Sequence, residues 1–139
     1  MYLDTRDLKE LLVELEEAEL AYTEAKNNLS NYDGDDEDKY EDLQEDLEDA
    51  ERNFSEEEEK KLHELRELRD QIGGEWEYGE TLIPEDMFPE YVEDLCKDCG
   101  YINRDFPHWI VIDWEKTSKN VAIDYQLVEY DGENFYVRA

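Results

Sequence analysis

Basic residues are scarce in this chain of 139 residues, because 14 Lys and Arg stand against 43 Asp and Glu, a formal net charge of −29. Proteins that bind DNA, RNA or an anionic membrane through a basic face rely on Lys and Arg to neutralise phosphates. The composition therefore argues against such a face. It favours instead a basic partner, or a role as a substitute for an anion.

Long apolar runs, cysteine and histidine are also scarce. No run of about 18 apolar residues occurs, so no transmembrane helix is expected. The start, 1–4, lacks the basic and apolar segments of a signal peptide, so we expect a cytoplasmic location. The two cysteines, Cys96 and Cys99, should be buried, reduced thiols, since only His63 and His108 could join them in a zinc site.

Motifs for catalysis and for cofactor binding are missing as well. No nucleophile stands beside a base, no Gly-rich phosphate loop occurs, and carboxylates are too abundant for one pair to stand out. The acidic stretch from Asp33 departs from a calcium loop, because its sixth position is Asp38 and its twelfth is Gln44. We therefore expect no enzymatic activity, no cofactor and no metal.

The two halves of the chain differ in composition. All three Pro, all three Trp and five of the six Gly lie after residue 70. This contrast predicts an α+β protein with a helical hairpin over 1–73 and a small α+β domain over 74–139. Gly73 and Gly74 mark the boundary.

Apolar residues of the first half recur at spacings of three and four, which is typical of a coiled-coil seam. The first helix can be capped by Asp4 or Thr5 and should end at 31–36, and the second should break or bend near 53–55. The short loop predicts an antiparallel coiled-coil hairpin. Some seam positions are Ala or Tyr, so a partner helix or a second copy of the chain could complete the packing. The expected seam comprises Leu8, Leu11, Leu15, Ala18, Tyr22, Ala25, Leu29, Tyr32, Tyr40, Leu43, Leu47, Ala50, Phe54, Leu62, Leu65, Leu68 and Ile72.

The second half predicts alternating short elements. A strand is expected over 75–83, a helix over 84–99 that stops at Gly100, and a helix over 113–125. Asp131-Gly132 between alternating apolar residues predicts a β-hairpin over 128–137. The chain should therefore end in a hairpin.

A dense acidic run lies between Asp33 and Glu59, with 16 acids and two bases. As a helix this run would extend about 40 Å, with roughly one net charge per 3 Å, close to the spacing of ~3.4 Å along one DNA strand. The run is either a solvated helix face or a surface shaped to occupy a DNA-binding groove. Its candidate phosphate substitutes are Asp35, Asp36, Asp38, Glu41, Asp42, Glu45, Asp46, Glu48, Asp49, Glu56 and Glu57.

The last third resembles the C-terminal domain of the ArdA-type antirestriction proteins of phages, plasmids and conjugative elements. The resemblance is carried by the helix ending at Gly100, a loop with Pro107, the segment 112–121 that opens a helix, and the hairpin around Gly132. It also looks like short phage proteins that share only this module. The family's two preceding domains are absent, and the helical hairpin stands in their place.

The resemblance implies an acidic DNA mimic, often dimeric, that occupies the DNA-binding groove of type I restriction–modification enzymes without cofactor or chemistry. The implied partner is a basic DNA-binding protein of a host defence system, with no direct contact to nucleic acid or membrane. Within the shared module it implies five further phosphate substitutes, which are Asp105, Asp113, Glu115, Asp124 and Glu129.

Two other functions remain open from the sequence. An adaptor would bind a partner helix through apolar seam residues such as Leu15 and Tyr22, and its charge would serve solubility. An inhibitor of an RNA-guided nuclease would share the mimicry but not the target.

Overall fold

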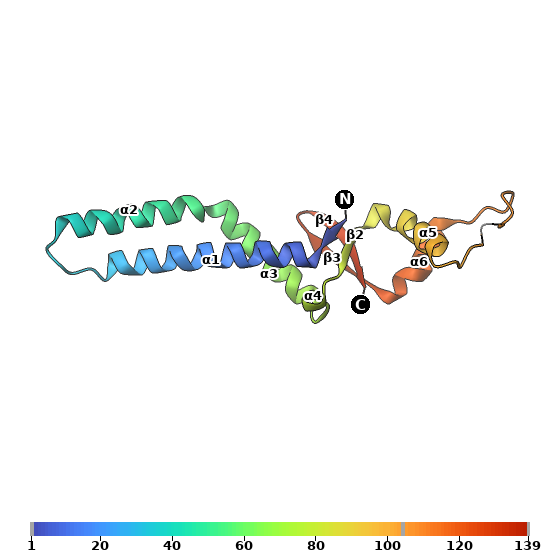
Figure 1. Cartoon of the computed structure of the whole chain (residues 1–139), viewed down its shortest axis with the longest axis horizontal. Coiled ribbons are helices and arrows are strands. Elements are labelled where there is room, and N and C mark those ends of the chain that lie inside the picture. Colours follow the sequence, from blue (N-terminus) through green and yellow to red (C-terminus); the bar gives the residue numbers. More distant parts are fainter. Residues whose placement is uncertain (1, 104, 139) are drawn as a thin grey trace. The chain divides into compact units, whose positions relative to one another are not determined.

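A computed structural model describes residues 2–103 and 105–138 (Figure 1). The chain contains helices and four strands, and the strands form one antiparallel sheet. The α+β class is therefore confirmed. None of the described helices is long and apolar enough to cross a membrane. The elements are β1 (Leu3–Asp4), α1 (Thr5–Ser30), α2 (Glu37–Asn53), α3 (Glu56–Ile72), α4 (Glu75–Tyr78), β2 (Thr81–Pro84), η1 (Glu85–Met87), α5 (Phe88–Asp98), α6 (Trp114–Val121), η2 (Ala122–Asp124), β3 (Tyr125–Tyr130) and β4 (Glu133–Arg138).

The chain divides into two compact units. The helical unit is Leu8–Glu67, and the sheet unit combines Met1–Asp7 with Leu68–Ala139. This division differs from the boundary expected at residue 73, because the first strand pairs with β2 and so belongs to the sheet unit. The sheet unit is therefore assembled from both ends of the chain.

In the helical unit, α1 and α2 run side by side in opposite directions (Figure 1). The rings of Tyr22 and Phe54 lie 6.2 Å apart, and Arg66 of α3 pairs with Glu16 and Glu19 of α1. Some of the expected seam residues are buried here, but Tyr40 is 43% exposed, and Leu12 is buried where the seam had placed the half-buried Leu11. The buried apolar residues of this unit are Leu8, Leu12, Leu15, Ala25, Ala50, Phe54, Leu62 and Leu65.

The helix ends follow local capping rules. The carboxylate of Asp4 accepts a hydrogen bond from the Arg6 amide at 2.8 Å, as expected for a cap of α1. α2 ends at Asn53 and α3 begins at Glu56, so the expected break is confirmed. The Ser55 hydroxyl donates a hydrogen bond to the Glu58 carboxylate, and this bond lowers the pKa of Glu58.

The sheet has the order β1-β2-β4-β3, with every neighbouring pair antiparallel. The terminal hairpin is confirmed, and Tyr130 lies opposite Glu133 across its two-residue turn. Both turn residues have positive φ, 52° at Asp131 and 76° at Gly132. This is the geometry of a type I′ turn, whose twist matches that of the flanking strands.

Three expected elements have different bounds. The strand expected over 75–83 is wrong in its first half, which forms α4 and buries Trp76, and only Thr81–Pro84 is extended. The helix expected over 84–99 begins as the 3₁₀ turn η1, because Pro84 still pairs with β4. The helix expected over 113–125 ends at Val121, because Tyr125 already pairs with Arg138 in the sheet.

The core of the sheet unit contains Ile83, Phe88 and Val92, each of which is at most 2% exposed. The Phe88 ring centroid lies 5.1 Å from that of Tyr125 and 4.3 Å from that of Tyr136, so α5 packs on this face of the sheet. The side chains on the opposite face are also buried, and they include Leu82, Val128, Phe135 and Val137. Both faces of the sheet are therefore covered in part, although Leu127, opposite Tyr136, is 48% exposed.

The two thiols do not share one environment. Cys96 is half-buried against the core of the sheet unit, whereas Cys99 is exposed, contrary to expectation. Cys99 is the C-terminal cap of α5, and the chain turns away at Gly100 with φ 73°. The structure describes both cysteines as free.

Candidate acidic binding surface

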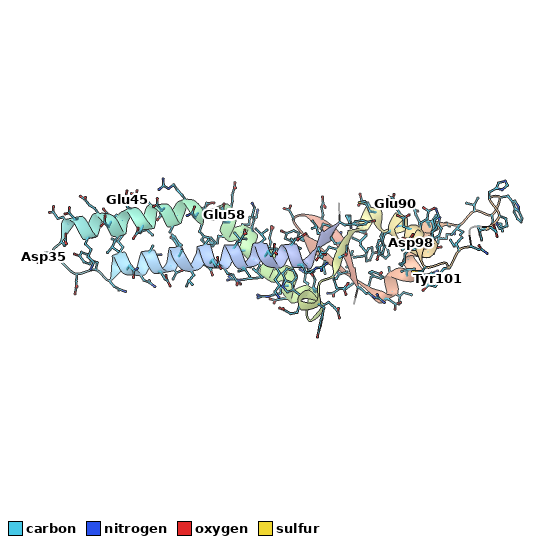
Figure 2. All side chains as sticks on the ribbon, in the orientation of Figure 1. Asp35, Glu45, Glu58, Glu90, Asp98 and Tyr101 are labelled. Carbon is cyan, nitrogen blue, oxygen red and sulfur yellow. The ribbon has the colours of Figure 1, made fainter. Side chains whose placement is uncertain are left out.

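The exposed face of α2 carries nine acids, which we call the α2 acidic face. Leu43, Leu47 and Ala50 recur at helical spacing on the side toward α1, which leaves the other directions to solvent. Figure 2 shows Glu45 on the side of α2 away from α1. The nine acids are Glu37, Asp38, Glu41, Asp42, Glu45, Asp46, Glu48, Asp49 and Glu51, and all of them are exposed.

The charge density of this face is close to that of one DNA strand. The helix has nine acidic and two basic residues, a net charge of −7. Over its length of about 25 Å this is roughly one charge per 3.6 Å, against ~3.4 Å per phosphate in one strand. Both bases have local partners, since Lys39 Nζ lies 5.5 Å from the ring centroid of Tyr32 and Arg52 pairs with Asp49. The face therefore presents a large excess of negative charge.

The acidic residues at the two ends of α2 have more specific positions. Asp35 lies in the loop before α2 (Figure 2), and Asp36 caps the helix by accepting hydrogen bonds from the amides of Asp38 and Lys39. Glu56 and Glu57 lie in the first turn of α3. All eleven candidate acids of the run are exposed, and seven of them belong to the α2 acidic face.

The five candidates of the C-terminal module are exposed but dispersed. Asp105 lies in the loop before α6, and Asp113 caps that helix by accepting a hydrogen bond from the Lys116 amide at 3.1 Å. Glu115, Asp124 and Glu129 lie in α6, η2 and β3, respectively. These five acids therefore lie on separate segments, whereas the acids of α2 recur along one helix.

Glu115 also lines a pocket in the sheet unit that the sequence did not predict. Its volume is about 420 Å³, and Phe88, Tyr136 and Lys119 lie in its wall. Glu85 and Asp86 line both this pocket and a neighbouring one of about 560 Å³, where Glu133 also lies. The pairing of β2 with β4 brings these acids together, so no local sequence signal could have found them.

Burial is the main cause of three raised pKa values in the sheet unit, those of Tyr2, Glu80 and Tyr125. Burial raises the pKa of Glu80, and the neighbouring Glu75 carboxylate adds to the effect. Burial and a hydrogen bond with Tyr91 raise the pKa of Tyr125 to about 12. Residues 2–103 and 105–138 contain no cluster of three or more His, Cys, Asp or Glu placed to hold a metal ion.

The comparisons with known proteins found no relative of this chain. No family model, curated protein or solved structure matches it. The similarity to the ArdA-type C-terminal domain stays a prediction that depends on the quoted residues.

Proposed function

We propose that this chain is an acidic DNA mimic, encoded by a phage or mobile element, that inhibits a host defence enzyme. It occupies the DNA-binding groove of that enzyme in competition with DNA, and a type I restriction–modification enzyme is the favoured target. The observation that supports this proposal is the α2 acidic face, with nine exposed carboxylates at a charge spacing close to that of one DNA strand.

We further infer that α1, α2 and α3 form an antiparallel coiled coil that holds the acids rigid. The buried residues at helical spacing, the contact between Tyr22 and Phe54, and the pairing of Arg66 with α1 support this inference. Rigidity matters because carboxylates that are already in place lose little conformational entropy when Arg and Lys side chains bind them. The binding energy is then shared among many weak contacts.

A competition assay tests the proposal. A purified type I restriction–modification enzyme is mixed with labelled duplex DNA that contains its recognition site, and the chain is added at increasing concentration. Competitive mimicry predicts that the chain displaces the duplex and that more DNA restores the complex. If the enzyme binds the chain and the duplex together, the proposal is wrong.

Salt dependence gives a second measurement in the same assay. A contact made through about seven charges should lose affinity by at least a hundredfold between about 50 and 200 mM salt. An adaptor that binds through its apolar seam would show little change. The adaptor has less support, because Leu15 is only 7% exposed and Tyr22 already packs on Phe54. An RNA-guided nuclease in place of the restriction enzyme tests the remaining alternative.

A further inference from the structure

The loop between α5 and α6 exposes an unusual set of large apolar side chains. Tyr101 is 78% exposed, Trp109 is 73% exposed and Val111 is 89% exposed. The loop, 99–113, extends beyond the ends of these two helices (Figure 1), and Figure 2 labels Tyr101 near its start. Phe106 and Ile110 of the same loop are 37% and 40% exposed, and we call these five side chains of segment 101–111 the apolar loop patch.

Local turns hold this patch out of the core. The amide of Tyr101 donates a hydrogen bond to the Cys96 carbonyl at 2.9 Å, which closes the end of α5. The Phe106 amide donates to Asn103, and the Ile110 amide donates to Pro107, both at 3.0 Å. These two turns shape the backbone on either side of Pro107, whose ring fixes φ. The aromatic side chains are therefore presented by a structured backbone.

The size of the patch indicates the kind of contact that it can make. Its exposed side chains offer on the order of 500 Å², as large as the largest apolar patch of a typical monomer. Stable interfaces bury about 800 Å² on each partner, so the patch is too small to form one alone. It has the size of an anchor that strengthens a contact made elsewhere on the chain.

Charge argues against a second copy of the chain as the occupant. Segment 101–112 has one Arg and one Asp, but each whole chain carries −29, so two copies repel each other. The same repulsion applies to an anionic membrane surface. A basic protein, in contrast, is attracted by the acids and can then bury the neutral patch.

We propose that the apolar loop patch inserts into an apolar cleft of the same basic enzyme that the α2 acidic face contacts. This inference rests on the proposed function and adds the origin of its specificity. Charge alone attracts the chain to any DNA-binding protein, whereas buried Trp and Tyr anchors require a matching cleft. The acids thus promote encounter, and the patch slows dissociation.

The test compares two variants of the full chain in binding to the purified type I enzyme. The double variant Trp109→Ala/Val111→Ala removes the most exposed part of the patch, and Tyr78→Ala is the control, because Tyr78 is 81% exposed but lies outside the patch. Affinity is measured at two salt concentrations. The double variant should bind at least tenfold more weakly at both, with the salt slope unchanged, and Tyr78→Ala should bind like the wild type.

Each outcome separates this inference from the proposed function. Equal binding by all three proteins would overturn the inference alone, whereas a wild type that fails to bind at low salt would overturn both. Sedimentation of the free chains tests a second copy, because a wild-type dimer that the double variant dissociates would assign the patch to self-association. Wild-type binding to phosphatidylcholine vesicles, lost in the double variant, would assign it to lipid. Either result would also overturn the inference.

Discussion

Two carboxylates among the candidate phosphate substitutes already serve the fold. Asp36 accepts hydrogen bonds from the amides of Asp38 and Lys39, and Asp113 accepts one from Lys116. Caps of this kind stabilise a helix through the hydrogen bond and through the favourable interaction of negative charge with the helix N-terminus. Replacing a capping Asp by the isosteric Asn therefore removes the charge and keeps the cap.

Asp36 allows the two roles to be separated. Asp36→Ala should lower the free energy of unfolding by about 1 kcal/mol, because the cap of α2 is lost, whereas Asp36→Asn should lower it much less. Both variants lose one charge of many, so their inhibition of DNA binding should differ little from that of the wild type. Urea unfolding followed by circular dichroism measures the first effect, and DNA competition measures the second. If Asp36→Asn alone abolishes inhibition, the charge is not shared as proposed.

The raised pKa of Glu80 predicts that the free energy of unfolding depends on pH. Burial raises its pKa, and Glu75 adds to the shift, so folding favours the protonated form. Its stabilising contribution is therefore complete below the pKa of the unfolded chain and is lost as the pH rises through the higher folded pKa. Glu80→Gln should raise the free energy of unfolding at pH 7 by a few tenths of a kcal/mol and weaken its change with pH.

The control for this prediction is Glu75→Gln, which removes the neighbouring charge and leaves the half-buried Glu80 carboxylate in place. It should shift stability in the same direction, and the two changes together should give less than the sum of their separate effects. The Glu80 amide donates to the Thr5 hydroxyl at 2.8 Å through its backbone, so this bond survives both substitutions. A loss of stability at pH 7 in Glu80→Gln would contradict the argument.

At the scale of elements, charge-removing variants of α2 and α1 distinguish DNA mimicry from a charge that serves only solubility. The variant Glu41→Gln/Asp42→Asn/Glu45→Gln/Glu48→Gln removes four exposed charges from the α2 acidic face. Its matched control removes four exposed charges from α1, at Glu10, Glu14, Glu17 and Glu24. The α2 variant should lose at least tenfold in inhibition and show a shallower salt dependence. The α1 variant should retain most of its inhibition, and an equal loss in both would indicate that net charge alone matters.

Elements whose signals are local could be predicted from the sequence. The break after Asn53, the hairpin turn at Asp131 and Gly132, and the end of α5 before Gly100 depend on residues within one turn of each feature. The α2 acidic face could be predicted for the same reason, because helical spacing places Leu43 and Leu47 on one side of α2 and spreads the acids over the remaining sides. Its exposure needs no knowledge of the rest of the fold.

Features that depend on distant pairing could not be predicted. β1 has two residues, and it is a strand because Leu3 pairs with Leu82. The residues of α4 alternate between acidic and aromatic, which favours a strand, but Trp76 is buried at 2% exposure in a helical turn. The apolar residues near Trp109 suggest a core segment by composition, and only the structure shows them exposed.

At the scale of the whole molecule, a net charge of −29 opposes the compact state. Added salt screens this repulsion, so the melting temperature should rise by several degrees between about 10 and 500 mM NaCl. The four-charge α2 variant should melt higher than the wild type at low salt and respond less to salt. Calorimetry at both salt concentrations checks this, and a melting temperature that falls with added salt would show that ion pairs outweigh the repulsion.

The route of the chain through its two units has a consequence for the order of folding. The helical unit consists of consecutive residues, whereas β1 must wait for β2, which is synthesised almost 80 residues later. Once Arg66 of α3 pairs with Glu19 of α1, two residues that are 47 positions apart in the sequence are held together. The closure entropy for pairing Leu3 with Leu82 is then that of a much shorter loop. During synthesis on the ribosome, the acidic helices should therefore fold first and act as the template on which the sheet closes.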